Sequence, residues 1–195
     1  MNRKVWDQLV STAALVIAGV MLFVGAAAIF GGNFGRNNVT DRLAPEQVQF
    51  PAYEAMTPDE QTSVGSFAGQ QVTTGPQAEA FARFIQGHLA LINEGKTYSQ
   101  TSAAGRVEGL DPKVAADLQV KADTLFKGET LRSILLNAYG WWTVATIALY
   151  TGYVMVIAGI VMLVLSVLGF RHAKKAGAVV AVETLPTRDY VSAGV

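Results

Sequence analysis

The stretch from Tyr139 to Phe170 constrains the fold more than any other feature, because it contains no Asp, Glu, Lys, Arg or His. A charge-free apolar run longer than about 18 residues is typical of a membrane-spanning helix. A helix also satisfies every backbone hydrogen bond inside lipid, where water is absent. We therefore predict a transmembrane helix over 139–170. Arg171, Lys174 and Lys175 follow directly, and such basic residues mark the cytoplasmic side of a span.

A second apolar run, residues 9–30, lies near the N-terminus behind Arg3 and Lys4. At 1.5 Å per residue its helix is about 33 Å long, which covers a hydrocarbon core of about 30 Å. The alternative is a cleaved signal peptide, with small residues at 25–28 near the cleavage site. The hydrophobic region of a signal peptide is usually about 7–15 residues long, so we favour a retained transmembrane helix.

These two runs predict a multi-pass protein of the cell membrane with both termini in the cytoplasm. Residues 1–8 form the cytoplasmic N-terminus, 31–138 an extracytoplasmic helical domain, and 171–195 a cytoplasmic tail that we expect to be disordered or loosely held. The composition agrees, since only 15% of the residues are charged and 51% are hydrophobic, whereas soluble domains carry about 25% charged residues. Residues 32–138 hold nine basic and twelve acidic residues, so no basic patch favours nucleic acid.

Local signals divide the central domain into helices. Thr57-Pro58 and Asp111-Pro112 each pair a capping residue with a proline at the first helical position. Thr74 or Gly75 precedes Pro76, which suits the first position of a helix. An apolar face, followed by a glycine at 95, predicts that this helix covers 76–94. The face consists of Phe81, Ile85, His88, Leu89 and Ile92, widened by Phe84 and Leu91.

The connections are less regular. Residues 31–40 are rich in Gly and Asn and predict the end of the first helix, and 70–73 suggest a short extended piece. Thr97 to Ala104 predict a further short helix. Residues 111–138 form a stem that leads into the second span, with Gly128 as a pause in its helix.

Aromatic residues around the second span are the candidate partner or interface contacts: Tyr139, Trp141, Trp142, Tyr150 and Tyr153. Tyr150 and Tyr153 fall where the outer aromatic belt of a membrane is expected. The other three then lie above the membrane, packed on their own domain or on a partner. The two tryptophans read either as partner anchors, since Trp is enriched at binding hot spots, or as ordinary belt residues. Small residues spaced by four within each span permit close helix packing.

Residues that could carry catalysis are scarce. The chain has no cysteine and two histidines, His88 and His172, which the predicted topology puts on opposite sides of the membrane. The nearest acidic neighbours of His88 in sequence, Glu79 and Glu94, lack the spacing of a helical metal pair. We interpret His88 as a satisfied core or boundary residue. No nucleotide-binding or nucleophile motif is present, so we predict no catalytic residue, no metal, no cofactor and no enzyme activity.

Several segments together resemble a group of small two-span membrane proteins of actinobacteria. They are MNRKVWDQLV, GNFGRNNV, FAGQQVTTGPQAEAFARFIQGHL and TLFKGETLRSILLNAYGWWTVATIALY. Some members of this group bear the name aromatic ring-opening dioxygenase. Such enzymes hold iron with histidines and a carboxylate, and a single histidine on each side of the membrane does not supply that set. We therefore reject this activity.

The predicted fold is an all-α membrane protein with two antiparallel transmembrane helices and a helical extracytoplasmic domain between them. The leading functional hypothesis is a non-enzymatic accessory or scaffold protein whose outer domain contacts a membrane-protein partner, or a second copy in a homo-oligomer. The alternative is a module that binds an envelope lipid or small ligand in a groove between the stem and the 76–94 helix.

Overall fold

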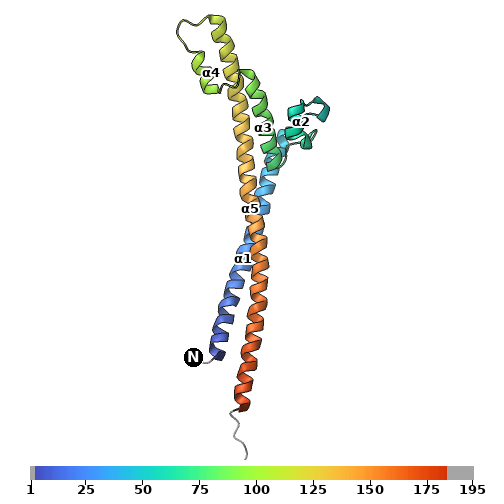
Figure 1. The fold of residues 1–195 in the computed structure, drawn as a ribbon, viewed down its shortest axis with the longest axis vertical. Coiled ribbons are helices and arrows are strands. Elements are labelled where there is room, and N and C mark those ends of the chain that lie inside the picture. The colour runs from blue at the N-terminus through green and yellow to red at the C-terminus, as the bar shows by residue number, and fades with distance from the viewer. Residues whose placement is uncertain (1–2, 184–195) are drawn as a thin grey trace, which may run out of the picture. The chain divides into compact units, whose positions relative to one another are not determined.

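The computed structural model describes residues 3–183, with side chains over 5–175, and every long element in that part is a helix (Figure 1). The elements are α1 (Arg3–Leu43), α2 (Pro58–Val64), α3 (Gly75–Ile92), α4 (Tyr98–Ala104) and α5 (Pro112–Glu183), with single 3-10 turns at Ala44–Glu46, Tyr53–Ala55 and Gly65–Phe67. The chain forms two compact units. One comprises residues 1–30 and 149–195, and the other residues 31–148.

Helices α1 and α5 are both long enough and apolar enough to cross a membrane, as the sequence predicts. Within the most apolar window of each, only 11% is buried inside the chain itself. A core helix of a water-soluble domain buries its apolar face against its own chain. The remaining apolar surface of these two helices is therefore uncovered by protein.

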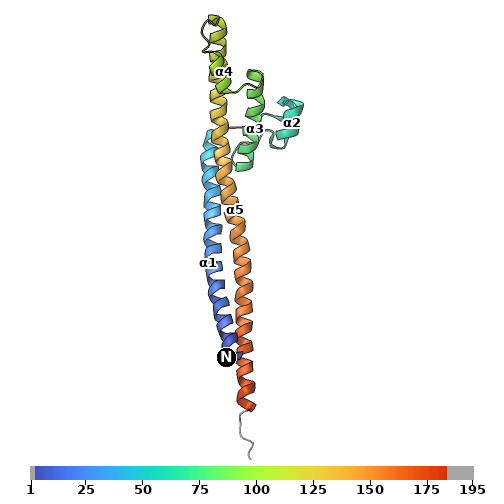
Figure 2. The same cartoon turned by 60° about the vertical axis from the view of Figure 1, so that its left-hand side comes forward.

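In the first unit, buried small residues recur at every seventh position along each helix. They are Ser11, Ala18 and Gly25 on α1 and Gly152, Gly159, Ser166 and Ala173 on α5. A period of seven keeps one narrow face of a helix turned toward its partner. The Ser166 hydroxyl donates a 2.7 Å hydrogen bond to the Ser11 carbonyl, and a Cβ built on Gly152 would lie 2.7 Å from the Gly25 carbonyl oxygen. The first part of α1 and the last part of α5 therefore touch backbone to backbone (Figures 1 and 2).

Helix α1 does not end after residue 30, so the predicted turn at 31–40 is wrong. The Gly- and Asn-rich segment is helical up to Leu43. Packing explains the difference. A Cβ on Gly35 would lie 2.8 Å from the Ala145 Cβ, and Val39 and Leu43 are buried. The glycines thus let α1 approach α5 within the second unit, and this contact outweighs their weak helix propensity.

Helix α5 runs without a break from Pro112 to Glu183, so the predicted stem does lead into the second apolar run, but the predicted pause at Gly128 is wrong. A Cβ on Gly128 would overlap the Leu89 side chain, which shows that this glycine makes room for α3. The predicted loose tail is helical as far as residue 183. The rest of the tail lies outside the described residues.

The predicted helix starts are confirmed. Thr57, Thr74 and Thr97 each accept a hydrogen bond from the backbone of the third helical residue, whose side chain returns one to the cap. This reciprocal pair is the capping box. The Asp111 carboxylate accepts from the Lys113 amide at 2.8 Å. These starts depend on neighbours in sequence, which is why the pattern predicts them well.

The core of the second unit lies between α2, α3 and the facing parts of α1 and α5. Its members include Val39, Leu43, Phe50, Met56, Val64, Val72 and Leu135. The predicted extended piece is confirmed, since the Val72 amide donates to the Val48 carbonyl at 2.8 Å. The predicted apolar face of α3 is only partly right. Alanines 78, 80 and 82 are the buried residues, whereas Leu91 is 84% exposed.

Candidate ligand groove

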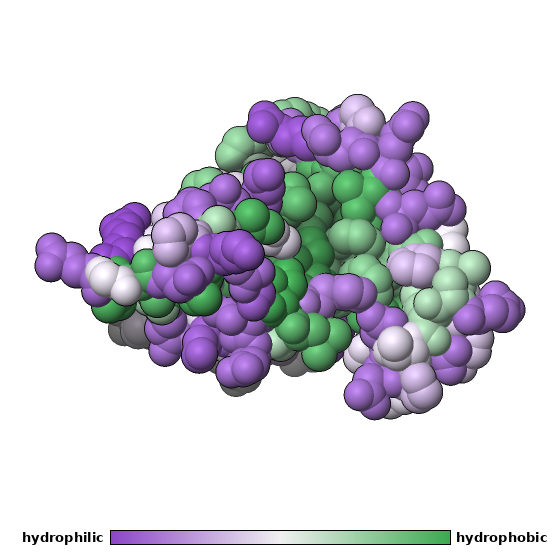
Figure 3. Space-filling model, turned by 90° about the horizontal axis from the view of Figure 1, so that it is seen from above, coloured by the Kyte–Doolittle hydropathy of each residue, from purple (hydrophilic) through white to green (hydrophobic). Residues whose placement is uncertain are grey.

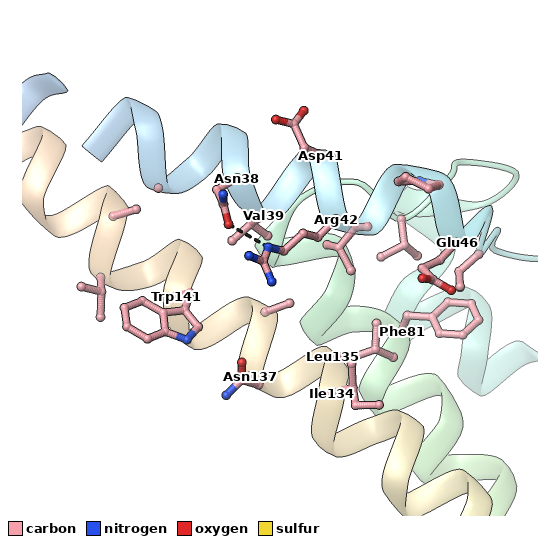
Figure 4. A pocket seen from close by; sticks show the side chains of 18 of the residues that line it. Asn38, Val39, Asp41, Arg42, Glu46, Phe81, Ile134, Leu135, Asn137 and Trp141 are labelled. Atoms are coloured by element: carbon pink, nitrogen blue, oxygen red, sulfur yellow. Dashed lines mark hydrogen bonds between the residues drawn. The ribbon is translucent and has the colours of Figure 1, made fainter. Parts of the chain in front are cut away.

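An open cavity of about 1130 Å³ lies within the second unit. We call it the α1–α5 groove (Figure 4). Its walls come from three helices and the connections between them. They are the end of α1 with the following turn (Gly31, Phe34, Gly35, Asn38, Val39, Asp41, Arg42, Leu43, Pro45, Glu46), two extended residues (Val48, Val72), α3 (Phe81, Ile85) and α5 (Leu131, Ile134, Leu135, Asn137, Ala138, Trp141, Val144, Ala145, Ala148).

The α1–α5 groove is large, long and mostly apolar. Ligand pockets usually measure about 300–1,000 Å³, so this one exceeds the size needed for a small metabolite. Its α5 wall extends from Leu131 to Ala148, which is about 25 Å at 1.5 Å per residue. One leaflet of a bilayer core is about 15 Å deep. The groove is therefore long enough for an extended acyl chain.

Apolar side chains along the groove are open to the surroundings rather than covered by the chain. Phe34 is 63% exposed, Ile134 60% and Trp141 65%. Figure 3 shows hydrophobic residues (green) exposed between hydrophilic ones (purple) on the face seen from above. Uncovered apolar surface of this extent marks a binding site for a ligand, a membrane or a protein.

One cation projects into this apolar setting. The Arg42 Nε donates a 2.9 Å hydrogen bond to the Asn38 side-chain oxygen one turn earlier on α1. Figure 4 shows the Arg42 guanidinium between α1 and α5, whereas the Asp41 carboxylate points away from α5. Among the described side chains no carboxylate lies within salt-bridge distance of Arg42. The bond to Asn38 engages Nε and leaves the two Nη atoms available to a ligand.

Trp142 contributes to the core of the second unit rather than to the groove. Its ring packs on Gly75 at the start of α3, where an added Cβ would overlap the Trp142 Cβ and Cγ. The Arg36 guanidinium lies 4.5 Å from the ring centroid, a cation–π distance. The Arg36 guanidinium thus lies against a ring of the protein itself, whereas only the Nε of Arg42 has a partner in the described part of the protein.

The structure separates the five aromatic residues that the sequence puts forward as contacts. Trp141 lines the α1–α5 groove. Tyr139 is in the same unit, 38% exposed, and outside the groove lining. Tyr150 and Tyr153 belong to the first unit and are 64% and 47% exposed. Their exposure suits contact with lipid or protein, and the belt position remains a prediction.

Sequence reasoning missed Arg42, Asn38 and the whole α1 wall, because residues 31–40 read as a turn. One signal was present. Asn38 and Arg42 are four residues apart, the spacing at which side chains meet on a helix. That signal has meaning only once the segment is known to be helical.

His88 is exposed and lies outside the groove, so the core interpretation is wrong and the boundary interpretation applies. Its Nε2 is 3.4 Å from the Glu60 carboxylate. The backbone hydrogen bond from Thr57 lowers the pKa of Glu60, helped by the Thr57 hydroxyl and by the charge of His88, against a smaller rise from desolvation. Among the described residues no group of three or more His, Asp or Glu side chains is arranged to hold a metal ion.

No protein-family model, curated protein or solved structure matches this chain. The function is therefore inferred from the geometry of each unit.

Proposed function

We propose that this chain is a non-enzymatic membrane protein that binds a membrane lipid in the α1–α5 groove. In this proposal α1 and α5 cross the cell membrane as two antiparallel helices, both termini are cytoplasmic, and residues 31–138 lie outside the cytoplasm. The groove is the observation that supports lipid binding over the accessory role. Helices packed without a groove in the second unit would have favoured the accessory role instead.

The register of the helix pair supports an antiparallel crossing. Contacts pair Ser11 with Ser166 and Gly25 with Gly152, so residue numbers fall along α5 as they rise along α1. The chain leaves the first predicted span at residue 30 and enters the α1 wall of the groove at Gly31. On α5 the groove lining extends to Ala148, within the second predicted span.

The size and chemistry of the groove support a lipid as the occupant. Its lining is apolar except for Asn38, Asp41, Arg42, Glu46 and Asn137. Burying apolar surface is worth about 25 cal/mol per Å², and an acyl chain supplies more such surface than a compact metabolite does. A few polar groups in an otherwise apolar site orient a ligand.

Native mass spectrometry of the full chain, purified in a mild detergent, tests this function. We expect one lipid molecule to remain bound to the wild type. Ile134→Asp places a carboxylate on the exposed lining of the groove. An unpaired charge beside a buried acyl chain costs several kcal/mol, so lipid occupancy should fall more than tenfold.

Val120→Asp is the matched control, because Val120 is on the same helix, is 65% exposed and does not line the groove. This variant should retain lipid at the wild-type level. Equal loss in both variants, or a wild type that retains no lipid, would contradict lipid binding in the groove.

The accessory role is the second candidate, and exposed apolar residues outside the groove favour it. Val120 and Phe126 on α5 are 65% and 55% exposed. A membrane-protein partner or a second copy that covers this surface should be captured by crosslinking in native membranes. Val120→Asp should then abolish capture while Ile134→Asp spares it, the reverse of the pattern expected for lipid binding.

A further inference from the structure

We propose that the lipid bound in the α1–α5 groove is anionic and that Arg42 binds its phosphate. This inference builds on the proposed function and adds the chemical class of the ligand. The observation behind it is that the Arg42 guanidinium lines a mostly apolar groove, bonds Asn38 through Nε, and has no carboxylate partner among the described residues.

The Arg42 side chain is exposed to solvent, so a ligand that enters the groove can reach its guanidinium. The Arg42 Nε donates a 2.9 Å hydrogen bond to Asn38, and this bond favours one orientation of the side chain before any ligand arrives. Holding a binding group in its bound conformation reduces the entropy lost on binding. The two Nη atoms then form the fork that pairs with two oxygens of a phosphate.

The charges around Arg42 do not satisfy it. Asp41 points away from α5 in Figure 4. Glu46 is four residues further along the chain, beyond the end of α1, and makes no ion pair with Arg42. Arg36, the neighbouring cation on α1, is already placed over the Trp142 ring. Arg42 is thus the cation in the groove lining that is free for a ligand.

A second donor lies on the opposite wall. Asn137 belongs to α5 and lines the same groove, and Figure 4 shows it on the α5 side of the Arg42 guanidinium. Its amide donates hydrogen bonds to oxygen. The apolar wall of Leu131, Ile134 and Trp141 flanks this polar position. A headgroup phosphate held between Arg42 and Asn137 therefore leaves an acyl chain along the α5 wall.

The bilayer, rather than free inorganic phosphate, is the source to which this proposal commits. A small anion would leave the remaining apolar lining uncovered. An anionic phospholipid fills both parts of the site, since its phosphate meets Arg42 and its acyl chain covers the exposed apolar side chains.

The test compares two lipids with identical acyl chains, phosphatidylglycerol and diacylglycerol, titrated against the full chain in detergent and counted by native mass spectrometry. We expect the wild type to bind phosphatidylglycerol at least tenfold more tightly. Arg42→Gln should reduce this preference to less than threefold while diacylglycerol binding is unchanged. Arg42→Lys, which keeps the charge and loses the fork, should give an intermediate preference.

Arg83→Gln is the matched control, because it removes the same charge from the same unit at a residue that pairs with Glu79 outside the groove. It should keep the wild-type preference. If the wild type binds both lipids equally, or if Arg42→Gln keeps the preference, the role of Arg42 is refuted while lipid binding stands. If the wild type binds neither lipid, the proposed function itself fails.

Discussion

Replacing Gly25 by leucine is expected to separate the two apolar helices. A Cβ at this position would lie 3.0 Å from the Gly152 carbonyl oxygen and 3.0 Å from the Val156 amide nitrogen. Both atoms are backbone and cannot move without shifting α5. Overpacking a close contact of this kind costs about 1–3 kcal/mol, which corresponds to a factor of about 5–150 in the equilibrium between the packed and separated helices.

Gly19 is the control on the same helix, because nothing lies within 4 Å of an added Cβ there. Gly19→Leu adds the same volume and apolar surface without a clash. Gly19→Leu should leave helix packing unchanged. Any difference between the two variants is then due to the contact of Gly25 with α5 and not to the added leucine itself.

The assay uses the absence of native cysteine. In a background carrying Ser11→Cys and Ser166→Cys, whose serines touch across the pair, the disulfide equilibrium in glutathione buffer measures the effective concentration of one thiol at the other. Gly25→Leu should lower it about 5–150-fold, and Gly19→Leu should not. Equal behaviour of the two variants would refute the close packing of α1 on α5 at the glycines.

Three further outcomes follow from the second unit. Gly75→Ala overlaps the Trp142 side chain and should lower the stability of the detergent-solubilised protein by about 1–3 kcal/mol, measured by thermal unfolding. Thr101→Val removes the acceptor of a buried 2.8 Å hydrogen bond and should cost a similar amount. Because the pKa of Glu60 is lowered from its ordinary 4.5, its contribution to stability is complete above that pH and is lost as the pH falls through the folded-state pKa. Glu60→Gln should therefore flatten the acid side of the stability profile.

Sequence reasoning succeeded where the signal was local. The caps at Thr57, Thr74 and Thr97 depend on residues three positions apart, and the apolar runs are long enough to identify without knowledge of the fold. The short extended piece before α3 was also predicted. In each of these cases residues close together in the sequence determine the structure.

Sequence reasoning failed where packing between segments distant in the sequence decides the conformation. Gly35 and its neighbours read as a turn because glycine and asparagine disfavour a helix, yet contact with Ala145 keeps α1 helical. Gly128 read as a pause for the same reason. The seven-residue period of small residues is present in the sequence, alongside the four-residue spacing that predicts close helix packing.

The groove was only half predictable. A groove between the stem and the 76–94 helix was expected, and Leu131 and Phe81 do line one. Its third wall, with Arg42, could not be anticipated, because a turn at 31–40 would have left no helix there. The polar position in the groove therefore emerges only from the structure.

The proposed function places the central domain outside the cytoplasm. Single-cysteine labelling tests this orientation most directly. Ser66→Cys and Lys175→Cys place one thiol at an exposed position in each predicted compartment. A membrane-impermeant maleimide should label Ser66→Cys in intact cells, and Lys175→Cys only after the membrane is permeabilised. Labelling of Lys175→Cys in intact cells, with Ser66→Cys protected, would contradict the account.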